Sequence, residues 1–180
     1  RLLQLSAWAG LAPALAGAAA PAATLGDDLD LLTQALLELH PGTWRYLSRA
    51  QFDDGLARLR AAWRQAPPLP ALALTMNRFL ATLRCGHTYT NFYNQRGAMK
   101  ETLCEQPPRL PLHFTWLGQR MVVTKAHPSA AAEVPVGSEV LALDGRTPAQ
   151  LLAALLPLVR ADGHNVHAQR ALLAPGGDDE

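Results

Sequence analysis

The residue of this chain best suited to chemistry is His87, which stands in the stretch Leu83-Arg84-Cys85-Gly86-His87-Thr88. An imidazole takes up and releases protons near neutral pH, so a positioned histidine can serve as a general base. Gly86 lets the backbone turn sharply in front of it. The stretch follows a predicted helix and leads into a strand predicted over Thr88–Tyr93. His87 is therefore either a general base or a structural residue at a junction between two elements.

The beginning of the chain has the composition of a processing segment. Arg1 precedes a short apolar run, and small residues follow over Ala16–Ala23. This order is typical of a secretory signal peptide, and the run is too short and too interrupted by proline for a membrane span. A disordered leader rich in alanine and proline is the alternative. We predict a signal peptide or leader over residues 1–25, export to the periplasm or the medium, and no stable membrane insertion after its removal.

Two cysteines, Cys85 and Cys104, are separated by eighteen residues. An even number of cysteines in an exported chain indicates a disulfide, which would stabilise the fold by about 3 kcal/mol. A metal site formed by Cys85, His87 and Cys104 is the alternative, but it lacks a fourth ligand and a Cys-x-x-Cys pair. A Cys85 nucleophile is disfavoured, on the expectation that the side chains of Cys85 and His87 point to opposite faces of the chain. We expect a Cys85–Cys104 disulfide, no metal and no cofactor.

The composition excludes several classes of function. The chain has 180 residues, enough for one ordinary domain or two small ones, and 49% of them are hydrophobic. Charged residues make up 17%, both signs are spread along the chain, and the net charge is +1. Such a distribution gives no electrostatic basis for binding nucleic acid or an anionic membrane.

Three amphipathic helices are predicted after the leader. Apolar residues recur with helical spacing from Asp27 to His40, from Ser48 to the break at Ala66-Pro67, and from about Ala71 to Arg84. Pro41-Gly42 ends the first helix, and Ser48 with Gln51 forms a capping box at the second. We predict a helical domain over residues 26–109, which includes the Gly-His-Thr element and a loop over residues 94–108.

The following residues have the alternation of a small sheet. Strands are predicted over residues 110–116 and 120–125, joined through Gly118, and over residues 139–143. Asp144-Gly145 then forms a tight turn, and Thr147-Pro148 begins a helix. This order predicts a PDZ-like β/α domain over residues 110–160, whose sheet edge and helix would bind an extended peptide. A β/α unit without a peptide groove is the alternative.

The order of these parts resembles the tail-specific, or C-terminal-processing, serine peptidases of the group that includes the tricorn core. The resemblance covers about Asp27 to Leu173. It rests on the acidic helix that ends at His40-Pro41, the Phe52 helix, Leu83–Thr88, Leu110–Leu112 with its hairpin, Val136–Gly145 and Ala161-Asp162-Gly163. It implies an α+β chain in which a helical domain and a PDZ-like domain precede an α/β catalytic domain. Residues 161–180 would be the truncated start of that catalytic domain.

By this resemblance the chain is the N-terminal fragment of an exported serine-type endopeptidase, a hydrolase acting on protein or peptide substrates. Tricorn-like members take their general base from the element that His87 matches, whereas other members use a Ser–Lys pair and do not need it. No serine of the chain, namely Ser6, Ser48, Ser129 or Ser138, lies in a glycine-rich segment like the one that precedes the family's nucleophile. The fragment by itself is therefore expected to be inactive. The alternative is a non-catalytic periplasmic peptide-binding module.

Overall fold

The structure, a computed structural model, describes residues 22–91, 94, 97–105 and 110–174. The described residues divide into two compact units. The helical unit contains the described residues of 22–105 together with 160–164, and the sheet unit contains residues 110–159 and 165–174. Helices and a three-stranded antiparallel sheet confirm the α+β class. The predicted leader lies almost entirely outside the described residues, and the predicted domain boundaries stay a prediction.

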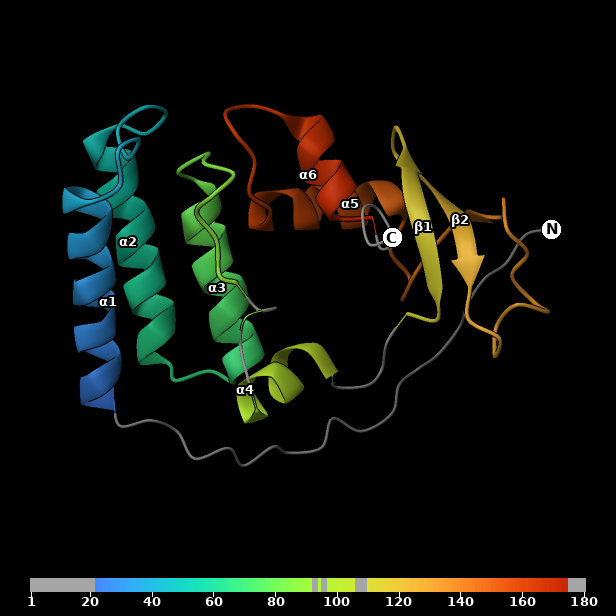
Figure 1. Cartoon of the computed structure of the whole chain (residues 1–180), viewed down its shortest axis with the longest axis horizontal. Helices are drawn as coiled ribbons and strands as arrows, with labels where there is room; N and C mark the ends of the chain where they lie inside the picture. Colours follow the sequence, from blue (N-terminus) through green and yellow to red (C-terminus); the bar gives the residue numbers. More distant parts are fainter. Residues whose placement is uncertain (1–21, 92–93, 95–96, 106–109, 175–180) are drawn as a thin grey trace. The chain divides into compact units, whose positions relative to one another are not determined.

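The helical unit is built on α1 (Ala22–Glu38), α2 (Arg49–Arg64) and α3 (Leu69–Ala81), which lie side by side with α2 packed against both others (Figure 1). The three predicted helices are confirmed, although α1 begins before Asp27 and α3 ends before Arg84. Their apolar faces meet in one core, formed by Leu29, Leu36, Phe52, Leu59, Phe79, Leu80 and Leu83. The predicted capping box is also confirmed, because Gln51 N–H donates to Ser48 Oγ at 3.2 Å while Ser48 N–H donates to Gln51 Oε1 at 2.9 Å.

The chain beyond α3 does not form the predicted strand. Residues 88–91 lie in no strand, and residues 92 and 93 fall outside the described residues. The threonines there bond to helical-unit side chains in place of a strand partner: Thr90 Oγ1 donates to Asn77 Oδ1 at 2.6 Å, and Thr88 Oγ1 bonds to His40 Nε2. The predicted loop after residue 94 contains a short helix, α4 (Ala98–Lys100), and a π-helical turn, η1 (Glu101–Glu105).

The sheet unit contains β1 (Leu112–Leu117), β2 (Arg120–Ala126) and β3 (Glu139–Val140), in the order β1-β2-β3. The predicted hairpin is confirmed, with Gly118 at φ +66° in its turn. The third strand is shorter than predicted, because Leu143 pairs with Arg146 across the Asp144-Gly145 turn rather than with β2. Both residues of that turn have positive φ, as a tight hairpin turn requires.

Helix α5 (Pro148–Leu155) begins at a capping box formed by Thr147 and Gln150, with proline in its first turn as predicted. The short helices η2 (Leu156–Leu158) and α6 (Val166–Leu172) follow. Alternate residues of the sheet pack inward with α5 in a core formed by Leu112, Phe114, Trp116, Met121, Val123, Val134, Val140 and Leu152. This core holds α5 against the small sheet. The PDZ-like character of the unit stays a prediction.

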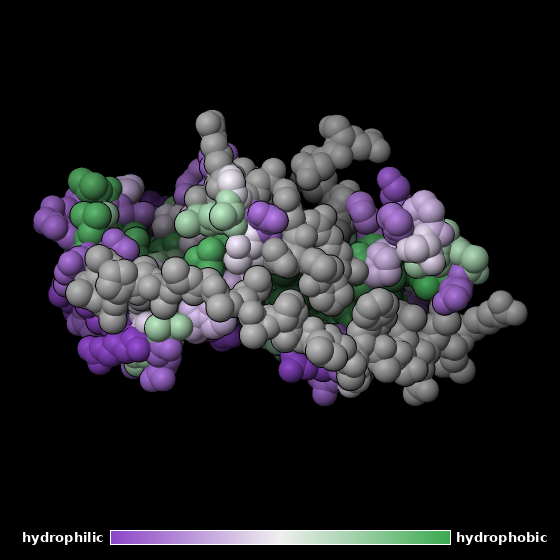
Figure 2. Space-filling model, turned by 90° about the horizontal axis from the view of Figure 1, so that it is seen from below, coloured by the Kyte–Doolittle hydropathy of each residue, from purple (hydrophilic) through white to green (hydrophobic). Residues whose placement is uncertain are grey.

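The surface of the helical unit mixes hydrophobic and hydrophilic side chains, as the face seen in Figure 2 shows. Leu31 of α1 and Leu39, just beyond its end, are exposed, while Arg60 of α2 forms an ion pair with Asp30 of α1. Among the described helices, none has both the length and the apolar character that a bilayer span requires.

Candidate functional site

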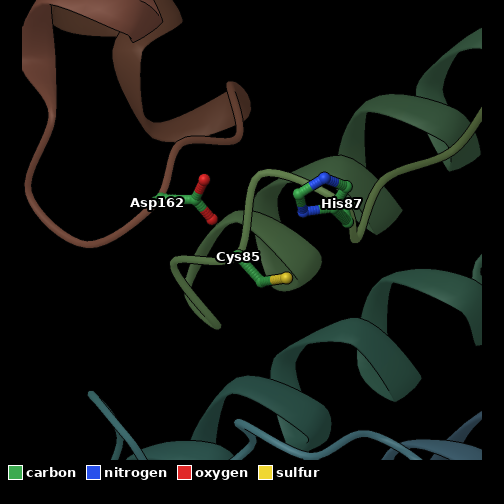
Figure 3. Close-up of side chains that lie close together, drawn as sticks. All are labelled: Cys85, His87 and Asp162. Atoms are coloured by element: carbon green, nitrogen blue, oxygen red, sulfur yellow. The ribbon is translucent and has the colours of Figure 1, made fainter.

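Three side chains that carry free electron pairs converge just beyond α3 (Figure 3). The Cys85 sulfur, a ring nitrogen of His87 and a carboxylate oxygen of Asp162 all lie within 4.8 Å of one another. Cys85 is half-buried, and His87 and Asp162 are exposed. All three residues belong to the helical unit, so the site is contained in one compact unit.

Cys85 and His87 lie together because the backbone turns between them. Thr88 N–H donates to the Cys85 carbonyl at 3.2 Å, which closes a four-residue turn around Gly86 and His87. The sequence-based expectation that these two side chains point apart is therefore wrong, because the turn brings the Cys85 sulfur and a ring nitrogen of His87 within 4.8 Å of each other. Arg84, just before the turn, has φ +51°, a conformation uncommon for a residue with a side chain.

Asp162 reaches the turn from a distant part of the sequence. Its Oδ1 accepts a hydrogen bond from Gly86 N–H at 2.7 Å, across 76 residues of sequence. Gly163 N–H donates to the Arg84 carbonyl at 3.0 Å. These two bonds hold residues 160–164 against the turn, and they present the Asp162 carboxylate to Cys85 and His87.

Gly86 is required at this point by a close approach. A Cβ atom on Gly86 would lie 3.0 Å from Asp162 Oδ2, so the carboxylate would have to shift by a few tenths of an ångström. Gly86 does not have a positive φ. The sequence suggests that this glycine serves a sharp turn, whereas in the structure it leaves space for the Asp162 carboxylate.

His40 fixes the far side of the turn, and the sequence analysis gave it no such role. Its Nδ1 accepts a hydrogen bond from Gly42 N–H at 3.2 Å, so Nε2 carries the ring proton and donates to Thr88 Oγ1 at 2.9 Å. Thr43, which is buried, donates from its hydroxyl to the Leu36 carbonyl at 2.6 Å and keeps this loop against α1. The His40-Pro41-Gly42 sequence indicated a helix end, but nothing in it named Thr88 as the partner.

Residues 160–164 make further contacts within the helical unit. The ring of His164 packs edge-on to that of Tyr46, with centroids 5.8 Å apart, and its Nδ1 bonds to the Arg84 guanidinium. Gly163 has φ +60°, and a Cβ there would lie 3.1 Å from the Tyr46 hydroxyl. Ala161 is buried. The segment is therefore fitted closely to the surface that carries His87.

A cavity of about 600 Å³ opens beside the three side chains. Leu36, Leu39 and Leu83 give it an apolar wall, and Arg45 and Arg84 add two cationic groups. Among the described residues that line it, Asp162 is the one acid. Such a cavity offers room for a small ligand or for one side chain of a larger one.

The site residues differ in how many partners they already have. Neither the His87 imidazole nor the Cys85 thiol forms a hydrogen bond or an ion pair with any described residue, whereas Asp162 Oδ1 is occupied by Gly86. The arrangement can accept a proton at His87, and its three donor atoms can hold a cation. No described side chain forms a disulfide with Cys85, and the side chain of Cys104 lies outside the described residues, so the Cys85–Cys104 disulfide stays a prediction.

No described serine contacts His87. Ser48 caps α2, and Ser138 lies in the turn before β3. The Ser129 hydroxyl bonds to His127 Nδ1 at 2.9 Å in an exposed turn of the sheet unit, where the Ser129 N–H also donates to the same nitrogen. This pair is a local turn contact two residues apart. Ser6 lies outside the described residues.

The chain was also compared with known proteins. No family model, no curated protein and no solved structure matches it.

Proposed function

We propose that this chain is the N-terminal part of an exported serine-type endopeptidase of the tail-specific kind, with His87 as the general base. The observation that carries the proposal is an exposed imidazole beside an anchored carboxylate, at the edge of an open cavity. A general base must have a free lone pair, access to substrate and a fixed orientation. His87 has the first two among the described residues, and Asp162 is placed to supply the third.

The carboxylate has a defined task in this mechanism. In a nucleophile–histidine–carboxylate arrangement, the acid holds the ring in the productive tautomer and stabilises the imidazolium ion that forms. Asp162 Oδ1 accepts the hydrogen bond from Gly86 N–H, so Oδ2 remains to accept one from the His87 ring. The separation of up to 4.8 Å is longer than a hydrogen bond, but such bonds are often loose in a free enzyme and shorten when substrate binds.

In the proposed reaction, a serine outside these 180 residues attacks the carbonyl of a peptide bond. His87 takes the hydroxyl proton as the C–O bond forms, and then gives it to the leaving amine as the C–N bond breaks. Water hydrolyses the resulting ester with the same residue as base. Leu36, Leu39 and Leu83 would receive an apolar side chain of the substrate, and the sheet unit would bind an extended part of it.

The test is serine-directed labelling of the native protein purified from its source. A fluorophosphonate probe, followed by intact-mass measurement and peptide mapping, should label one serine located beyond Glu180. His87→Ala should reduce the labelling rate by about 100-fold or more, the usual contribution of a general base, with unchanged circular dichroism. His127→Ala, which changes an exposed histidine of the sheet unit, is the matched control and should label at the normal rate.

Two results would overturn the proposal. One is labelling of His87→Ala at the same rate as the parent protein, which would show that His87 is not the general base. The other is a native protein that takes up no label while it binds extended peptides, which would establish the non-catalytic binding module instead.

A further inference from the structure

We propose that Cys85, His87 and Asp162 form a binding site for a divalent thiophilic metal ion, with Zn²⁺ as the best-suited ion. The sequence-based expectation was that no metal binds, because the set Cys85, His87 and Cys104 lacked a further ligand. The structure brings in Asp162, which sequence spacing could not connect to the other two.

The donor set matches the chemistry of zinc. A thiolate sulfur, an imidazole nitrogen and a carboxylate oxygen are the three kinds of ligand that zinc accepts in proteins. Mg²⁺ and Ca²⁺ prefer oxygen ligands throughout, so a set with one sulfur and one nitrogen selects against them. The thiolate and the carboxylate also supply two negative charges, which balance the charge of the ion with neutral His87.

The geometry needs only small side-chain movements. In a tetrahedral zinc site the ligand atoms are about 3.3–3.6 Å apart, so a pair at 4.8 Å must approach by about 1.2–1.5 Å. His87 is exposed and has no hydrogen-bond partner among the described residues, so rotation of its side chain can provide this approach while the turn stays in place. Three protein ligands leave the fourth position to water, as in open zinc sites.

The donor atoms of Cys85 and His87 are available to an ion, and the Asp162 carboxylate is already oriented by a hydrogen bond from Gly86 N–H. Cys85 and His87 have no hydrogen-bond partner among the described residues. Asp162 can ligate through Oδ2 while Oδ1 keeps its bond to Gly86 N–H, an outer contact of the type that orients carboxylate ligands. The neighbouring Arg84 guanidinium is engaged by His164 Nδ1, although its charge lowers the affinity for any cation.

Metal binding at this place would have two consequences. The ion would take the lone pair of His87, so under the proposed function it would inhibit peptide hydrolysis reversibly. A disulfide between Cys85 and Cys104 would remove the sulfur ligand, so the site would exist only with a reduced Cys85. The inhibitory role rests on the proposed function, whereas the binding site does not.

The experiment is a Co²⁺ titration of the tag-free 180-residue chain under reducing conditions. One ion per chain should bind and give a near-ultraviolet thiolate-to-cobalt absorption band, which Zn²⁺ then abolishes by displacement. Cys85→Ser should remove the band. His87→Ala and Asp162→Asn should weaken binding by about 10-fold or more. Asp162→Asn is chosen because its amide oxygen can still accept from Gly86 N–H, which keeps the loop in place.

Three controls are expected to bind as the parent chain does. They are His127→Ala and Asp144→Asn, which change exposed residues of the sheet unit, and Cys104→Ser, which removes the other thiol. Absence of the absorption band would overturn the proposal. So would binding that survives in Asp162→Asn but is lost in Cys104→Ser, because the third ligand would then be Cys104. The metal titration uses the 180-residue chain and does not depend on the proposed catalytic serine. Serine labelling is measured with a chelator present, so that bound metal cannot affect it. Each proposal can therefore fail without the other.

Discussion

The turns of the sheet unit and the candidate site of the helical unit differ in the range of the contacts that hold them. In the sheet unit the hairpin turns at Gly118, a tight turn joins Leu143 to Arg146, and Thr147 caps α5, all through neighbours in sequence. In the helical unit the site depends on the Gly86–Asp162 bond across 76 residues and the His40–Thr88 bond across 48. Local contacts build a scaffold, whereas distant ones bring together groups that can do chemistry.

The largest expected effect comes from the core of the helical unit. Leu59 is 1% exposed, so Leu59→Ala should lower the free energy of unfolding of that unit by about 2–5 kcal/mol through lost burial and a cavity. Hydrogen exchange followed by mass spectrometry would locate the loss in α1, α2 and α3. Leu31→Ala, at a position 67% exposed, should change stability by less than about 0.5 kcal/mol. Equal effects of the two substitutions would contradict the assigned core.

A smaller loss is expected from Gly86→Ala. The added methyl group would collide with the Asp162 carboxylate, at a cost of about 1–3 kcal/mol, and release residues 160–164 from the turn. Exchange of the amides of 160–164 should become faster while α5 keeps its protection. Gly26→Ala has open space in α1 and should leave stability unchanged or improve it. Unchanged exchange in 160–164 would mean that the carboxylate does not pack on Gly86.

His40 and Thr88 should act as a pair. His40→Ala and Thr88→Val each remove one side of the same hydrogen bond, so each should cost about 0.5–1.5 kcal/mol. The double variant should lose less than the sum of the single losses, as a denaturant-melt cycle can measure. Additive losses would show that the bond contributes nothing and that the turn is held by its own backbone.

The smallest effect should come from an exposed ion pair of the sheet unit. The hydrogen bond from Arg120 lowers the pKa of Glu139, so this contribution to stability is complete above the ordinary carboxylate range and is lost as the pH falls through the lowered value. Melting curves recorded between neutral and acid pH should show that the stability of Glu139→Gln depends slightly less on pH than that of the parent chain. The difference should shrink in high salt, because both groups are exposed. If the variant lost more stability than the parent chain on acidification, the ion pair with Arg120 would not stabilise the fold.

The same contrast explains what could be predicted from sequence. The Ser48 capping box, the hairpin at Gly118 and the Asp144-Gly145 turn each follow from the chemistry of a few adjacent residues, and each is confirmed. A strand needs a partner that its own residues do not specify. Residues 88–91 have strand-like composition, yet Thr88 and Thr90 bond to His40 and Asn77 instead.

The sequence indicates two residues of the candidate site but not the third. The residue types of His87 and Cys85 mark them as candidates, but the sequence does not indicate the turn that brings their side chains together. Asp162 could not be connected to them, since no local pattern records an approach across 76 residues. The one available signal was Gly86, whose missing side chain marks the place where another group comes close.

The most direct test of the site is nuclear magnetic resonance of the Gly86 amide in the parent chain and in Asp162→Ala. A hydrogen bond of 2.7 Å to a carboxylate should shift the Gly86 amide proton strongly downfield and slow its exchange, and the methylene protons of Asp162 should show a nuclear Overhauser effect to it. In Asp162→Ala the shift should return to the ordinary range. A Gly86 amide that has the same shift and exchange rate in both proteins would show that Asp162 does not reach the turn, and that Cys85, His87 and Asp162 do not share a site.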